Sequence, residues 1–160
     1  MIFVTLGSQK FQFDRLLQAL DQLVEDGTVT ESVFAQTGAS TYIPRHYAFT
    51  PFLDRETFSE KMAQADIVIT HGGTGAIIGA VKQGKRVIAV PRLARYGEHV
   101  DDHQLQVIGQ FQEQNLLFAL EDCSQLKDAL SRIRDHRFQA YQSNTENILK
   151  DIGNYLESLL

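Results

Sequence analysis

The chain has 160 residues, which is enough for one domain with a substantial core and too few for two ordinary domains. It is 43% hydrophobic and 22% charged, which excludes extended disorder, and its net charge of −5 gives no basis for nucleic-acid binding. The single cysteine, Cys123, excludes an internal disulfide framework and predicts a small buried residue in a reducing cytoplasm. The opening MIFVTLGSQ lacks the basic region of a signal peptide, and no apolar run approaches the ~20 residues of a membrane span.

Short apolar runs alternate with amphipathic stretches along the chain, and each run ends at glycine, proline or a polar residue. In chain order we expect strand Ile2–Leu6, helix Asp14–Gly27, strand Ser32–Gln36, strand Tyr47–Phe52, helix Arg55–Ala65, strand Asp66–Thr70, helix Ala76–Gln83, strand Arg86–Val90, helix Asp101–Gln114, strand Leu116–Leu120, helix Gln125–Ile133 and a final helix over about 141–160. Continuous apolar strands that alternate with helices predict a single Rossmann-like α/β domain, with a mostly parallel sheet and helices on both faces.

A glycine-rich turn, His71-Gly-Gly-Thr-Gly75, follows the strongest strand signal and precedes a helix. Ligands of open parallel sheets bind beyond the carboxyl ends of the strands, where glycines let backbone N–H groups approach an anion. The segment Gly79–Lys85 matches a P-loop in spacing, but it lies at the end of a helix and Arg86 replaces the required Ser or Thr. No dinucleotide fingerprint follows the first strand. We therefore favour a diphosphate site over a purely structural turn.

The motifs ADIVITHGGTGAII, RVIAVP and EHVDDHQ, in this order, resemble the C-terminal, nucleotide-sugar-binding half of GT-B glycosyltransferases, the glycosyltransferase family 28 C-terminal domain. The chain is similar to the stand-alone form of that half, as in the Alg13 subunit and in bacterial PssE/EpsE-type polysaccharide proteins. The segment Arg92–Gln104 looks like a signature of the bacterial group. The resemblance implies one nucleotide-sugar-binding domain over residues 1–160.

This resemblance implies roles for particular residues. The donor diphosphate would be held by the turn after the fourth strand and by the turn after the first, at His71, Gly72, Gly73, Thr74, Gly75, Gly7 and Ser8. The hydroxyls of the donor sugar would be reached by Asp101, His103 and Gln104. His99 and His103 are the candidates for the catalytic base, unless that base lies on a partner.

Two histidines four residues apart, His99 and His103, have carboxylates between them, but they lack the H-E-x-x-H order and a third strong ligand. We predict neither a metal nor a cofactor. Lys85, Arg92 and Arg95 are expected to form a small basic group near the mouth of the cleft, as solubilising charges or as contacts for an anionic ligand.

The resemblance implies a two-component inverting glycosyltransferase that transfers a hexose or hexuronic acid from a UDP-sugar to a lipid-linked diphosphate sugar in exopolysaccharide or capsule biosynthesis. The acceptor half would be a membrane-associated partner similar to Alg14 or PssD/EpsF-type proteins. The chain would then lie at the cytoplasmic face of the cell membrane, and the apolar stripe of the final helix could dock on that partner. One departure is Gly79, where many relatives carry an acidic residue suited to the ribose. This departure favours the alternative of a non-catalytic enhancer that stabilises a partner glycosyltransferase.

Overall fold

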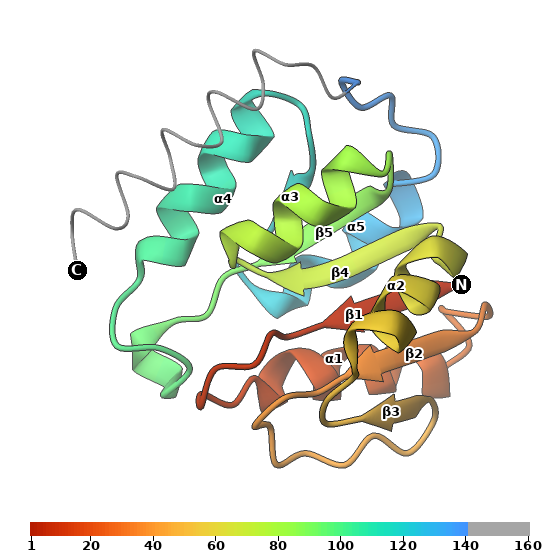
Figure 1. Ribbon diagram of the computed structural model, residues 1–160, viewed down its shortest axis with the longest axis vertical. Helices are drawn as coiled ribbons and strands as arrows, with labels where there is room; N and C mark the ends of the chain where they lie inside the picture. Colours follow the sequence, from red (N-terminus) through yellow and green to blue (C-terminus); the bar gives the residue numbers. More distant parts are fainter. Residues whose placement is uncertain (141–160) are drawn as a thin grey trace.

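The structure is a computed structural model that describes residues 1–140. Within these residues, six strands form one parallel sheet in the order β3-β2-β1-β4-β5-β6 (Figure 1). The strands are β1 (Ile2–Thr5), β2 (Val33–Gln36), β3 (Ala48–Thr50), β4 (Ile67–His71), β5 (Arg86–Val90) and β6 (Phe118–Ala119). The helices are α1 (Asp14–Glu25), α2 (Arg55–Gln64), α3 (Thr74–Lys82), α4 (His103–Glu113) and α5 (Leu126–Arg132), with short 3₁₀ turns η1 (Ala94–Tyr96) and η2 (Cys123–Gln125). This confirms the predicted Rossmann-like α/β domain.

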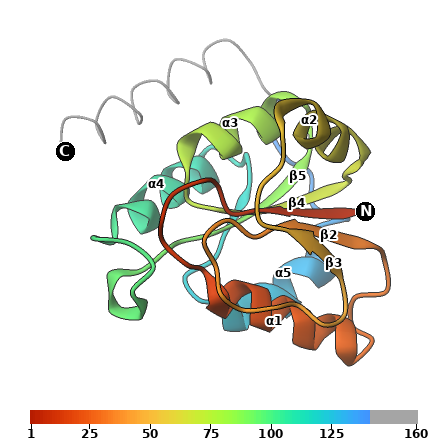
Figure 2. The same ribbon diagram turned by 60° about the horizontal axis from the view of Figure 1, so that its bottom comes forward.

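Helices cover both faces of the sheet, as Figure 2 shows, with α1 and α5 on one side and α2, α3 and α4 on the other. Successive residues of a strand point to opposite faces, so a sheet covered on both sides needs strands that are apolar throughout. In β1, Ile2 and Val4 belong to the core under α1 and α5, whereas Phe3 belongs to the core under α2, α3 and α4. The alternation explains why the apolar runs of the sequence were a reliable strand signal.

The strand register brings the ends of the inner strands to one edge of the sheet. Thr5 of β1 lies between Gln36 of β2 and Thr70 of β4. The chain builds the sheet outward from β1 to β3 and then crosses back to add β4 on the other side of β1. The loops that leave β1 and β4 therefore diverge from a common point, and this switch in strand order is where open α/β sheets bind ligands.

Several element boundaries depart from the predictions, and β6 covers only Phe118–Ala119 where Leu116–Leu120 was expected. β3 is shorter than expected, and α4 begins at His103 rather than at Asp101. α3 begins at Thr74, two residues earlier than predicted, because Gly73 already serves as its N-cap. The predicted final helix, about 141–160, lies outside the described residues. No helix within residues 1–140 is long and apolar enough to cross a membrane.

Candidate functional site

A cleft of about 390 Å³ opens at the carboxyl ends of β1 and β2, between α2 and α3. Its wall is apolar on the α2 side and is built of glycines and small polar groups where β1 and α3 meet. The lining residues are Thr5, Gly7, Ser8, Gln36, Phe52, Leu53, Phe58, Met62, Gly75, Ala76, Gly79 and Gln83. The volume and the mixed lining are those of a small-molecule site, and no charged side chain is among these residues.

The N-terminus of α3 borders this cleft. Gly73 is the N-cap residue, and as a glycine it has no side chain with which to cap the first-turn N–H groups. Gly75, in the first turn, lines the cleft and is exposed. Thr74 is partly buried at the first helical position. Uncapped N–H groups and the positive end of the helix dipole together favour an anion here.

The His71 side chain fills the space between the two glycine-containing loops. A Cβ atom built on Gly73 would lie 2.1 Å from His71 Cε1, and one built on Gly7 would lie 2.8 Å from His71 Nε2. The residue is only 7% exposed, and burial lowers the pKa of its imidazole to about 3, with smaller contributions from the charges of Arg92 and His99. His71 is therefore a neutral side chain that requires glycine at positions 7 and 73.

Gln104, in the first turn of α4, is buried against the turn. Its Oε1 accepts hydrogen bonds from the backbone N–H of Gly72 at 3.1 Å and of Arg92 at 2.9 Å. Its Nε2 lies 3.5 Å from Nδ1 of His71. A Cβ atom on Gly72 would meet Gln104 Cβ at 2.5 Å, so this position also needs glycine. Gln104 thus connects the loop after β5 to the turn after β4.

Gln36 is a site residue that the sequence reasoning missed. Its Oε1 accepts from Thr5 Oγ1 and Leu6 N, and its Nε2 donates to the carbonyls of Gly7 and Pro51 at 2.9 and 2.8 Å. The side chain therefore joins the loops that follow β1 and β3 under the cleft. The available signal was its place as the last residue of an inner strand, the position that His71 holds in β4.

The prediction that Lys85, Arg92 and Arg95 form a basic group at the mouth of the cleft is wrong. Arg92 is 1% exposed, and its guanidinium donates to the carbonyls of Leu6 and Phe11 at 2.5 and 2.7 Å. Lys85 donates to the carbonyls of Ala63 and Ala65, at the amino-terminal edge of β5. Of these three cations only Arg95 is exposed, and it lies in the loop after β5. The three cations do not meet, since two of them satisfy buried or distant backbone carbonyls.

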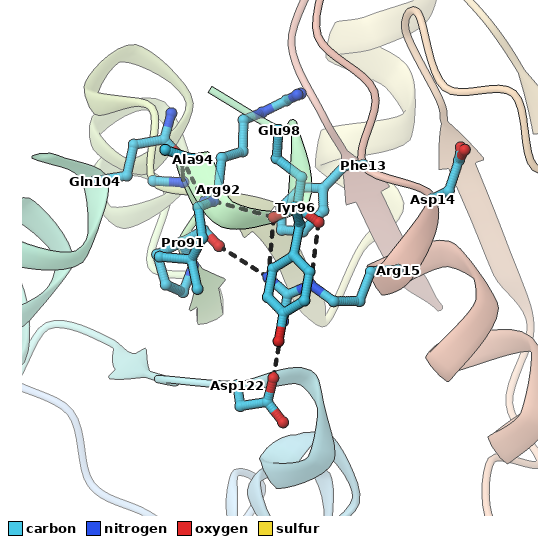
Figure 3. A network of polar contacts seen from close by, with 12 residues as sticks. Phe13, Asp14, Arg15, Pro91, Arg92, Ala94, Tyr96, Glu98, Gln104 and Asp122 are labelled. Carbon is cyan, nitrogen blue, oxygen red and sulfur yellow. Dashed lines mark hydrogen bonds and ion pairs between the residues drawn. The ribbon is translucent and has the colours of Figure 1, made fainter. Parts of the chain in front are cut away.

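A second, partly buried cation, Arg15, supports the loop after β5 from the other face (Figure 3). It forms ion pairs with Glu98 at 3.0 Å and Asp122 at 2.9 Å, and donates to the Pro91 carbonyl. Glu98 is fully buried and also accepts from the backbone N–H of Leu93. This network forms part of the wall of a larger and more open hollow of about 900 Å³ on the α1 face, which none of the predicted site residues line.

Cys123 also lines this hollow. It is buried, as predicted, and burial raises the pKa of its thiol to about 12. The cysteine is therefore a protonated core residue.

The structure brings His99, Asp101 and His103 together before and at the start of α4. Nδ1 of His99 lies 3.2 Å from Asp101 Oδ1, and Nε2 of His103 lies 3.7 Å from Asp101 Oδ2. The His99 ring contacts Phe11, with centroids 5.3 Å apart, so the group adjoins the loop after β1. Within residues 1–140, no group of three or more histidine, cysteine or acidic side chains is arranged to hold a metal ion.

Comparison with known proteins gives a family match over residues 1–156, to the glycosyltransferase family 28 C-terminal domain. The UDP-N-acetylglucosamine transferase subunit ALG13 of Homo sapiens is 26% identical over 124 residues, which are 73% of this chain and 11% of that protein. The subunit of the same name from Yarrowia lipolytica is 27% identical over 107 residues, which are 66% of this chain and 53% of that protein. This chain therefore spans about a tenth or about half of these curated relatives.

Among solved structures, Acinetobacter baumannii MurG has a TM-score of 0.57 at 16% identity, covering 94% of this chain and 49% of that one. The glycotransferase of kitacinnamycin has a TM-score of 0.52 at 14% identity, covering 99% of this chain and 40% of that one. At these identities the likeness concerns the fold alone. It confirms the predicted architecture, that of one half of a GT-B glycosyltransferase.

Proposed function

The chain belongs to the glycosyltransferase family 28 C-terminal domain family, and we propose that it is the UDP-sugar-binding subunit of a two-component inverting glycosyltransferase. The observation that carries the proposal is the glycine-capped N-terminus of α3 beside a cleft at the switch point of the sheet. The relatives named UDP-N-acetylglucosamine transferase subunit support both the donor class and a second subunit.

The donor would lie along the cleft. Its diphosphate would accept hydrogen bonds from the first-turn N–H groups of α3, next to Thr74 and Gly75, and from the Gly7-Ser8 turn. The uracil ring would lie against the apolar wall that includes Phe52 and Leu53. These contacts place the negative charge at the positive end of the helix and the flat ring against apolar side chains.

The donor sugar would extend toward the start of α4. Asp101 and His103 present a carboxylate and an imidazole suited to sugar hydroxyls. Transfer would proceed by attack of the acceptor hydroxyl on the anomeric carbon, as a base takes up its proton and the bond to UDP breaks with inversion. His99 and His103 are the candidate bases on this chain, and α3 would stabilise the leaving diphosphate.

The partner would supply the acceptor half. We propose a membrane-associated subunit similar to Alg14 or PssD/EpsF-type proteins, which presents a lipid-linked diphosphate sugar at the cytoplasmic face of the membrane. The product context would be exopolysaccharide or capsule assembly, with a hexose or hexuronic acid transferred. The resemblance of Arg92–Gln104 to bacterial polysaccharide proteins supports this context.

The test is to place a charge at Gly75, because a Cβ atom there meets nothing within 4 Å. An aspartate in the first turn of a helix is favourable for folding, whereas its carboxylate would repel a diphosphate. Gly75→Asp should therefore leave thermal stability unchanged or higher and weaken UDP binding at least about tenfold by calorimetry. Gly75→Asn is the neutral control of the same shape and should keep most of the affinity. Equal UDP binding by both variants would reject the diphosphate assignment.

The alternative, a non-catalytic enhancer, has one observation in its favour. Gly79 lines the cleft, so no carboxylate is present there to bind a ribose. UDP-sugars titrated into the chain alone, and then into the chain with its partner, distinguish the two functions. Binding in either setting supports the donor subunit. An increase in the partner's activity without donor binding supports the enhancer.

A further inference from the structure

The amide of Gln104 has only one possible orientation. Its two polar atoms differ, because the oxygen only accepts hydrogen bonds and the nitrogen only donates them. The atom that faces the backbone N–H groups of Gly72 and Arg92, at 3.1 and 2.9 Å, must therefore be the oxygen. The NH₂ group then faces Nδ1 of His71 at 3.5 Å.

This orientation determines which nitrogen of His71 carries a proton. A donor directed at Nδ1 requires that Nδ1 be an unprotonated acceptor. The ring is buried and neutral, as its lowered pKa also indicates, so its one proton must be on Nε2. No hydrogen bond within residues 1–140 involves Nε2, which lies close to the backbone of Gly7.

We propose that Gln104 is a positioning residue that fixes His71 as the Nε2–H tautomer, and that this neutral N–H is a hydrogen-bond donor for the diphosphate beside Gly7. The first half of the inference concerns the free chain alone, and the second half rests on the proposed function. Gln104 would at the same time hold the turn through its hydrogen bond from the Gly72 N–H. The Nε2–H of His71 and the first-turn N–H groups of α3 would then keep a fixed relative position.

Because His71 stays neutral, the charge of the binding site should not change with pH. A histidine that could accept a proton would add a positive charge to the site at low pH and would make donor affinity depend on pH between about 5 and 7. A histidine held neutral by burial, with its Nδ1 occupied by an amide, supplies a directed donor at every pH in that range.

The experiment is ¹⁵N NMR of the imidazole rings in the full chain, which has five histidines. The signal that disappears in His71→Asn assigns the ring. The expected result is a neutral Nε2–H pattern that does not change between pH 5 and 8. An Nδ1–H pattern, or titration within that range, would overturn the proposal.

Gln104→Glu is the matched variant, since it keeps the shape and an oxygen for the two backbone N–H groups. Its second oxygen would face Nδ1 and require a proton there, so the His71 signal should change to an Nδ1-protonated form. An unchanged tautomer in this variant would overturn the role of Gln104. If the variant does not fold, the wild-type spectrum alone still decides the tautomer.

Addition of UDP then tests the second half separately. A shift of the His71 Nε2–H resonance on saturation supports the contact with the diphosphate, and UDP binding without that shift overturns it. Absence of UDP binding, with the Nε2–H tautomer observed, would reject the proposed function while the assignment of the tautomer stands.

Discussion

Two glycines of the turn after β4 should respond to alanine in opposite ways. A Cβ atom on Gly73 would lie 2.1 Å from Cε1 and 2.7 Å from Nε2 of His71, whereas one on Gly75 would have no atom within 4 Å. Gly73 has φ −74° and ψ 125°, a conformation that alanine adopts without strain. The cost of Gly73→Ala therefore comes mainly from the contact with the His71 ring, with a smaller contribution because alanine is a poorer N-cap residue than glycine.

The expected destabilisation by Gly73→Ala depends on how far the His71 ring would have to move. Carbon atoms in van der Waals contact are about 3.5–4.0 Å apart, so the ring or the turn would shift by more than an ångström. Overpacking of this kind costs about 1–3 kcal/mol in the free energy of unfolding. Gly75→Ala should instead be neutral or stabilising by up to about 1 kcal/mol, since alanine is the better helix former.

A double-mutant cycle in urea unfolding measures the contact. Gly73→Ala should be more destabilising in the wild-type background than in the His71→Ala background, where only the loss of the glycine N-cap remains, giving a coupling of about 1–3 kcal/mol. In thermal unfolding each kcal/mol should appear as a shift of about 2–4 °C. An equal cost in both backgrounds, or equal stabilities of the Gly73→Ala and Gly75→Ala variants, would refute the packing of His71 between the two loops.

Acidification should destabilise the chain through His71, whose folded pKa of about 3 lies below its ordinary value of 6.5. Below about pH 6.5 the unfolded state binds the proton first, so the free energy of unfolding should fall by up to about 1.4 kcal/mol per pH unit. His71→Asn should reduce this slope in urea unfolding at pH 7 and 5, and an unchanged slope would contradict the burial of the ring. Arg92→Lys should cost about 2–4 kcal/mol in thermal unfolding, because one ammonium group cannot replace the fork that reaches separate carbonyls. The exposed control Arg95→Lys should change stability by no more than about 0.5 kcal/mol, and similar costs for both would argue against the buried role. Gly79→Glu should fold normally, since its Cβ meets no atom within 4 Å, and should strengthen UDP binding about tenfold in calorimetry by accepting bonds from the ribose. An unchanged affinity would mean that the ribose lies elsewhere.

The fold could be predicted from the sequence because its strands are buried on both faces. A run such as Ile67–His71 is apolar almost to its end, and such a run has few alternatives to an inner parallel strand. The location of the turn His71–Gly75 followed from the same order of strand and helix. Chain direction alone places that turn at the carboxyl edge of the sheet.

The surroundings of the turn could not be predicted because they depend on contacts between distant segments. The sequence predicts that Arg92 is a charged residue at the surface. In the structure its guanidinium donates to the carbonyl of Leu6, 86 residues away. Gln36 and Gln104 are buried amides whose partners are backbone groups of other loops. The sequence shows the side chain in each case, but only the folded chain shows the carbonyl or N–H group that it satisfies.

The charge balance of the cleft bears on why a second subunit would be needed. The lining residues of the cleft include no charged side chain, His71 is neutral, and Arg92 is used by backbone carbonyls. A diphosphate would then be bound by backbone N–H groups and by the dipole of α3. The N-terminal end of that dipole is equivalent to about half a positive elementary charge. Such a site positions an anion without neutralising it, so binding by the chain alone should be weak. The remaining countercharge would come from the partner, and donor affinity should therefore rise when the two subunits assemble.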